Sequence, residues 1–311
     1  MSFRAGLLLI SKLLGLTSVV WLTPPRYWRW LAGTGISHGD EALRPFYRRA
    51  LKISDEELLT TLCVARRRSL RESKIQVIGI AGPWRRWRPT IRLHGEEHLE
   101  AALRNGRGVI LWAGNFIYSD LVYKIALHDK GYSATQLYRP EHGFGSSKLE
   151  IRLLNPLWMA VEGRFLRQRV MIYGSDTAAA INALRSRLAE NGIVVIYFGN
   201  EGRRTTEVPF LNHRVRVATG PVAIACSTGA ALVPLFVVRN ADETFDVTLE
   251  EPLEVPLADD GAGRFDNVAA AMAWRLEPYA RSYPEQWRAW NELIEVDVAE
   301  ELPASFASTR R

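Results

Sequence analysis

The sequence predicts an α/β fold in which helices flank a mostly parallel central sheet, with a helical segment ahead of it. From Gly108 onward, short apolar runs of strand length alternate with segments of helical periodicity. This alternation is typical of a mostly parallel sheet covered by helices. Residues 1–75 show helical periodicity instead. With 311 residues the chain can bury a full core, as one large or two ordinary domains.

The first helical segment, residues 1–22, is apolar but contains Lys12, and Pro24 and Pro25 follow it directly. A spanning helix needs about 20 apolar residues, and a central lysine costs roughly 2.5–3.5 kcal/mol. No small-residue cleavage site follows, which disfavours a secretory signal. We therefore expect an interfacial helix on the bilayer, with a helix packed on the protein's own core as the alternative.

The remaining elements follow from periodicity and from helix-start signals. Ser54 opens a helix with a capping box, since acids follow it and apolar residues recur at helical spacing. The expected strands are residues 108–113, 132–138, 193–198, 231–238 and 244–250, and the expected helices are residues 119–130, 175–190 and 219–228. We divide the chain into a helical segment (1–75), an α/β core (76–291) and a loosely held charged tail (292–311).

The composition excludes several classes of protein. A hydrophobic content of 47%, with a mean hydropathy of −0.09, excludes a multispanning membrane protein. Cys63 and Cys226 lie in apolar surroundings, and their spacing matches no metal site, so inert thiols in a reducing compartment are the simplest interpretation. The six histidines are scattered, and no nucleotide-binding loop is present, so we expect neither a metal nor a cofactor.

The net charge of +6 is concentrated in two basic stretches. Arg66–Arg68, Arg71 and Lys74 form the first, and Trp84–Arg88 adds a basic-aromatic run. A basic patch binds nucleic acid or anionic lipid, but no nucleic-acid module is recognisable. We expect these stretches, with Trp28 and Trp30, to contact an anionic membrane surface; a solvated surface is the alternative.

The segment from Gly114 to Asp120 is the main candidate site. It follows an apolar strand run, begins with a small-residue break and ends in a carboxylate, with Asn115 five residues before Asp120. A strand-to-helix corner with this spacing can bring both side chains to one cavity. The local alternative is a helix N-cap followed by an acid in the first turn.

Further polar blocks follow other expected strands. Glu201 and Gly202 precede Arg203 and Arg204, whose guanidinium groups can bind a phosphate or carboxylate, although a solvated basic turn explains them equally well. Arg139, in Tyr138–Pro140, can face an anionic substrate group, and a solvated loop arginine is the alternative. We add Arg164 as another substrate-binding candidate. Pro234 lies within an expected buried strand.

In order and spacing, these blocks resemble the lipid A late acyltransferases of the lysophospholipid and glycerolipid acyltransferase superfamily. The resemblance runs from about Ile91 to Trp290 and includes Arg281–Trp290, which is similar to the family's terminal Pro-Glu-Gln-Trp signature. It implies a helix over residues 91–106 that leads into the first core strand. Family members place histidine where this chain has Asn115. An asparagine amide cannot accept a proton at neutral pH, and losing a general base typically removes about 10²–10⁴ in rate.

The resemblance implies acyl transfer from an acyl carrier protein or coenzyme A thioester, at the cytoplasmic face of the inner membrane. An amine acceptor that is already neutral needs no strong base, and a hydroxyl is the other acceptor considered. Asp120 would then relay the proton directly or through water, while Asn115 would donate to the oxyanion. The alternative is a catalytically lapsed relative that binds lipid or acyl chains, or that regulates a partner. The oligomeric state is left open.

Overall fold

The computed structural model describes residues 18–82, 87–138, 142–144, 148, 150–172, 177–256 and 263–294. Its central sheet has seven strands in the order β1-β9-β8-β2-β5-β3-β4. These strands are β1 (Ile91–His94), β2 (Val109–Ala113), β3 (Ala134–Tyr138), β4 (Gln168–Met171), β5 (Ile193–Tyr197), β8 (Ala231–Arg239) and β9 (Phe245–Leu249). All neighbouring pairs are parallel except β8 and β9, so the sheet is mostly parallel, as expected.

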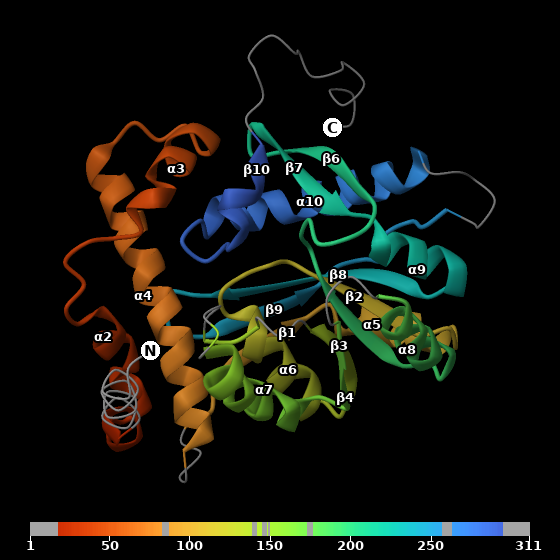
Figure 1. Ribbon diagram of the computed structural model, residues 1–311, viewed down its shortest axis with the longest axis horizontal. Coiled ribbons are helices and arrows are strands. Elements are labelled where there is room, and N and C mark those ends of the chain that lie inside the picture. Colours follow the sequence, from red (N-terminus) through yellow and green to blue (C-terminus); the bar gives the residue numbers. More distant parts are fainter. Residues whose placement is uncertain are drawn as a thin grey trace.

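Helices cover both faces of this sheet (Figure 1). They are α5 (Glu96–Arg104), α6 (Ser119–Asp129), α7 (Asn155–Glu162), α8 (Ala178–Ala189), α9 (Gly220–Thr228) and α10 (Gly263–Ser282). Alternate residues of β2 point to opposite faces, so Ile110 and Trp112 pack in one core and Val109 and Leu111 in the other. The first core takes side chains from α8, α9 and α10, and the second takes them from α5 and α6.

A small antiparallel sheet lies on the α10 side of the central sheet (Figure 1). It consists of β6 (Thr205–Phe210), β7 (His213–Ala218) and β10 (Leu293–Ile294). The sequence did not predict this hairpin. Leu293 and Ile294 pair with β7, and Trp290 is fully buried. The expected loose tail therefore does not begin at Glu292, and residues 295–311 lie outside the described part of the chain.

The N-terminal helices stand along one side of the α/β core (Figure 1). They are α2 (Trp28–Gly33), α3 (Arg44–Ala50) and the long α4 (Glu56–Ala81). Asp55 caps α4 by accepting hydrogen bonds from Glu57 N and Leu58 N, so the predicted cap at Ser54 is wrong by one residue. None of the described helices is long and apolar enough to span a bilayer.

Two expectations about the N-terminal region need correction. Trp28 does not face a membrane, because it is buried against α4, where a Cβ on Gly79 would lie 1.8 Å from its ring. Arg66 is also buried and pairs with Asp40, so the first basic stretch is not all surface. Residues 1–17 and most of Trp84–Arg88 lie outside the described residues.

The predicted helix over residues 91–106 is also wrong in its first part. Ile91–His94 form the strand β1, with the alternating exposure of a period-two segment. Gly95 then adopts a left-handed conformation with φ of 73°, and α5 follows. The other expected core elements occur with ends shifted by at most three residues.

Candidate active site

A strand-to-helix corner brings Asn115 and Asp120 to one cavity. Strand β2 ends at Ala113, and α6 begins at Ser119, so Asp120 lies in the first turn of the helix. The Ser119 hydroxyl donates to Gly114 O at 3.1 Å and closes the corner. A Cβ on Gly114 would lie 2.8 Å from Phe236, so the tight packing explains the glycine.

The cavity has a volume of about 490 Å³, and we call it the Asn115 cavity. It lies where β2, β3 and β5 end, which is where parallel sheets usually carry their sites. The polar side chains that line it belong to Asn115, Asp120, Gln136, Tyr138, His142, Tyr197, Glu201, Arg288 and Glu292.

Asp120 is buried and held by two partners. Arg288 Nη2 lies 2.6 Å from Asp120 Oδ2, and the Tyr197 hydroxyl donates to Oδ1 at 3.3 Å. Burial raises the pKa of Tyr197 well above its ordinary value, so this hydroxyl keeps its proton. The carboxylate therefore faces a permanent cation and a neutral donor.

The C-terminal signature fixes this arrangement. Gln286 O accepts from Ile117 N at 2.8 Å, and Arg288 N donates to Asn115 O at 2.8 Å. Gln286 also bonds the backbone of Arg239 through both side-chain atoms. Trp287 is fully buried and forms an antiparallel bridge with Phe116. The Pro-Glu-Gln-Trp segment thus anchors the corner and delivers Arg288 to Asp120.

A buried ion pair lies behind the same cavity. Lys124 Nζ and Glu162 Oε1 are 3.0 Å apart, with both side chains fully buried. Trp158 Nε1 donates to Oε1 at 2.8 Å, and the Tyr138 hydroxyl donates to Oε2 at 2.5 Å. His142 Nε2 lies 3.0 Å from Oε2. The Glu162 carboxylate thus meets a donor on every side.

These contacts decide the charge of Glu162. Burial by itself raises the pKa of this carboxyl, but His142, Lys124 and the hydrogen bonds outweigh it and lower the pKa to about 2. Burial lowers the pKa of Lys124, while Glu162 and Asp120 oppose that change. Glu162 is therefore an anion, held between His142 and Lys124.

Glu292 is the contrasting carboxyl at this cavity. Burial, with a smaller contribution from nearby Glu201, raises the pKa of Glu292 to about 7, although a backbone hydrogen bond at Asn200 opposes the rise. Its Oε2 atom is buried without a hydrogen-bond partner among the described residues. Glu292 is therefore partly protonated near neutral pH.

The structure brings only some of the predicted substrate-binding residues to this cavity. Glu201 lines it, whereas Gly202, Arg203 and Arg204 are exposed and do not. Arg164 donates to Ile80 O at 3.1 Å and lines a different cavity, with Arg167 and Arg169. Arg139 lies outside the described residues.

Sequence reasoning missed several polar residues of this cavity. His142 is one of the scattered histidines, and Glu162 and Lys124 belong to no motif. Tyr197 opens the block that contains Glu201, but the block predicts no role for it. Arg288 belongs to the terminal signature itself, so the signature could have pointed to it. His142 follows the Tyr138–Pro140 block within four residues, which was the only local signal for it.

One cluster offers ligands for a metal ion. Asp120, His142 and Glu162 each have one ligand atom within 4.8 Å of the other two. However, Arg288 and Lys124 already supply positive charge to the two carboxylates. A metal ion would have to displace these partners, so the residues present do not fit one.

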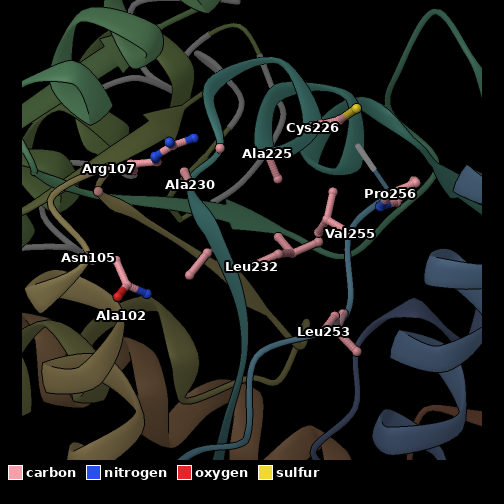
Figure 2. A pocket seen from close by; sticks show the side chains of 13 residues that line it. Ala102, Asn105, Arg107, Ala225, Cys226, Ala230, Leu232, Leu253, Val255 and Pro256 are labelled. Atoms are coloured by element: carbon pink, nitrogen blue, oxygen red, sulfur yellow. The ribbon is translucent and has the colours of Figure 1, made fainter. Parts of the chain in front are cut away.

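A second cavity, of about 530 Å³, lies at the opposite end of β2 (Figure 2). We call it the Cys226 cavity. It is lined by Arg107, Gly108 and Cys226, and otherwise by small or apolar residues and Asn105. Arg107 is the single charged residue in this lining, so the described residues bring no acid, base or nucleophile pair together there.

A comparison with protein families finds a match over residues 75–291 to the family described as bacterial lipid A biosynthesis acyltransferase. No curated protein matches the chain. Among solved structures, the chain matches the 1-acyl-sn-glycerophosphate (LPA) acyltransferase PlsC from Thermotoga maritima, at 12% identity and a TM-score of 0.34. That match covers 86% of this chain and 97% of the other.

Proposed function

Because the chain belongs to the bacterial lipid A biosynthesis acyltransferase family and is an acyltransferase of lipid substrates, we propose that residues at the Asn115 cavity catalyse acyl transfer. The acyl group moves from a thioester to an amine or hydroxyl. The donor is an acyl carrier protein or coenzyme A thioester. The observation that carries this proposal is the placement of Asn115 and Asp120 on one cavity at the end of β2.

Asn115 supplies a hydrogen-bond donor for the reaction. Its side chain is partly exposed at the cavity and forms no hydrogen bond with another described residue. A carboxamide N–H can donate to the thioester carbonyl oxygen and binds more strongly as that oxygen becomes negative. Asp120 relays the acceptor's proton, directly or through water, and also holds Arg288 at the cavity.

The charges around the cavity favour an amine as the acceptor. Asp120, Glu201 and Glu292 contribute carboxyl groups, whereas Arg288 is the one guanidinium among the described lining residues. An excess of carboxylates attracts an ammonium group and repels a phosphate or carboxylate. The amine loses its proton before or during attack on the thioester.

The donor binds across the rim of the cavity in this proposal. Arg203 and Arg204 are exposed and follow the cavity-lining Glu201 after Gly202. Guanidinium groups bind phosphate bidentately, and both donor types carry a phosphate on their pantetheine arm. Arg139, next to cavity-lining Tyr138, stays a candidate for the same role.

Thioester consumption tests the reaction. Wild type is incubated with an acyl carrier protein or coenzyme A thioester and a panel of amine and hydroxyl acceptors, and the released thiol is measured. We expect consumption that depends on an amine. Asn115→Ala should lower kcat by about 10²–10³-fold, or about 2.7–4 kcal/mol, as removal of other oxyanion donors does.

Asn115→His separates this function from its alternative. It should not improve turnover of the native amine but should create activity on ordinary hydroxyls, because it places an imidazole base at position 115 itself. If wild type consumes no thioester while Asn115→His does, the chain is a lapsed acyltransferase that binds lipid or acyl chains.

We place the enzyme at the cytoplasmic face of the inner membrane, bound peripherally to anionic lipid. Support comes from exposed apolar side chains near the N-terminus: Leu22 is 72% exposed and Trp30 is 70% exposed. Exposed tryptophan favours the headgroup region of a bilayer. Val20 and Trp21 belong to the fold, because Val20 is buried and Trp21 donates to Ile78 O, so deleting residues 1–22 would damage the core.

Flotation with anionic liposomes tests this placement with point substitutions instead of a deletion. Leu22→Ser with Trp30→Ser should reduce the floated fraction several-fold. Trp274→Ser is the matched control, since Trp274 is 74% exposed on α10, far along the chain. If wild type, the double variant and Trp274→Ser float equally, the surface with Leu22 and Trp30 does not contact the membrane.

A further inference from the structure

His142 lies beside Asp120, although the two belong to different segments of the chain. A ring nitrogen of His142 and a carboxylate oxygen of Asp120 are within 4.8 Å of each other. His142 lines the Asn115 cavity, and 16% of its side chain is exposed. Position 115 holds no histidine, but His142, which follows β3 in the chain, lies at the same cavity.

The orientation of His142 is set by three neighbours. Nε2 lies 3.1 Å and 3.0 Å from the two oxygens of Glu162. The ring packs edge-on against Tyr138, with centroids 4.8 Å apart, and against Trp158 at 6.3 Å. This is the environment of a fixed imidazole.

The pairing with Glu162 also determines the tautomer. Glu162 is ionised and can only accept hydrogen bonds, so Nε2 carries hydrogen and Nδ1 of the neutral ring carries the lone pair. No described residue bonds Nδ1.

We propose that His142, in place of Asp120, takes the acceptor's proton as the general base of the acyl transfer, with Glu162 as the residue that positions it. This inference rests on the proposed function of the Asn115 cavity. Glu162 orients the ring as the carboxylate does in other acid–base–nucleophile arrangements. Asn115 keeps its separate role as a donor to the oxyanion.

The step balances as follows. His142 Nδ1 accepts the proton from the acceptor nitrogen or oxygen while that atom bonds to the thioester carbonyl carbon. The tetrahedral intermediate carries its negative charge on the carbonyl oxygen, beside Asn115. When the C–S bond breaks, the imidazolium returns its proton to the departing thiolate. The products are the acylated acceptor and a free thiol.

Two other groups at the cavity compete for this role. Asp120 is occupied by Arg288 and Tyr197, and carboxylates in general are weaker bases than imidazole, with ordinary pKa values of about 3.9 and about 6.5. Glu292 lines the cavity too, but it has no described partner that orients its buried oxygen. His142 alone combines a fixed ring with proximity to Asp120.

The pH dependence of kcat/KM, measured with the full chain, tests the inference. Wild type, His142→Gln, Glu292→Gln and the exposed-surface control His38→Gln are compared with one thioester and one amine. Glutamine can still donate to Glu162, so the fold is disturbed little. We expect His142→Gln to lose about 10²–10⁴-fold in kcat, to keep the donor Kd within twofold, and to lose the ionisation of the acid limb.

A second variant guards against a structural explanation. His142→Ala should lose activity similarly and regain part of it in added imidazole, which a merely structural role would not give. If His142→Gln stays within threefold of wild type, or if Glu292→Gln removes the ionisation instead, His142 is not the base, while the proposed function stands. If wild type transfers no acyl group to any acceptor, the proposed function itself fails and this inference fails with it.

Discussion

Strand β2 has a cavity at each end, and the two cavities differ in chemistry more than in size. The Cys226 cavity is slightly larger, at about 530 Å³ against about 490 Å³. Its described lining holds one charged residue, whereas the Asn115 cavity brings together Asp120, Arg288 and His142 with two further carboxyl groups. The difference shows that convergent, partnered polar groups, and not cavity volume, single out the candidate site.

The topology explains why charge gathers at one end. At the carboxyl ends of parallel strands the chain turns into helix N-termini, where acids such as Asp120 are favoured. The C-terminal signature closes over the same end and adds Arg288. The other end receives the last turns of α5 and α9 and the small residues that pack between them.

The largest expected difference between the two ends is in catalysis. Asp120→Ala should lower kcat/KM by about 10²–10⁴-fold, because it frees Arg288 and removes the carboxylate beside His142. Cys226→Ala, at the other end of β2, should change kcat/KM by less than about threefold. The thiol-release assay measures both. If Cys226→Ala lowers kcat/KM more than Asp120→Ala does, the Cys226 cavity is the active site instead.

The next effect concerns stability. Glu162→Gln should lower the free energy of unfolding by about 3–5 kcal/mol, because it leaves Lys124 buried without its counter-ion. Adding Lys124→Met should recover part of the loss. Arg107→Gln is the control at the Cys226 cavity, and it should stay within about 0.5 kcal/mol because Arg107 is exposed. Denaturant unfolding gives all four values, and equal losses at both ends would contradict the comparison.

The smallest effect depends on pH. The folded pKa of Glu292 is about 7, above its ordinary value of 4.5, so the folded protein binds more protons than the unfolded chain between these values. Stability from this group is therefore present below about pH 4.5 and falls as pH rises to about 7. Glu292→Gln should become progressively more stabilising, relative to wild type, between pH 5 and pH 8. Thermal unfolding checks this, and a constant difference across that range would contradict it.

The sequence predicted the parts of the site that are local in the chain. Asn115 and Asp120 lie on one corner, so the change from strand to helix periodicity was enough to place them together. The same reasoning placed β2, β3, β5 and β8 with small errors at their ends. It failed for Ile91–His94, where a four-residue strand was absorbed into the following helix. It also missed the β6–β7 hairpin, although arginine and valine alternate from Arg214 to Val217.

The rest of the site depends on contacts between distant segments. Asp120 and Arg288 are paired by folding alone, and so are Lys124 and Glu162. No spacing rule connects such residues, and a buried lysine is unexpected from composition because isolated charges are costly to bury. Likewise, nothing local distinguished buried Arg66 from its exposed neighbour Arg67.

The closure of the corner by the C-terminal signature has a consequence for synthesis of the protein. Trp287 and Arg288 accept hydrogen bonds from Arg66 on α4 through their carbonyl oxygens, and Arg288 donates to Asn115 O. A nascent chain that ends after α10 contains all seven strands of the central sheet but lacks the cation that holds Asp120. A frameshift after residue 282 would therefore give a chain with its core strands but an unfinished cavity. Asp120 therefore gains its cation only after Arg288 has been synthesised.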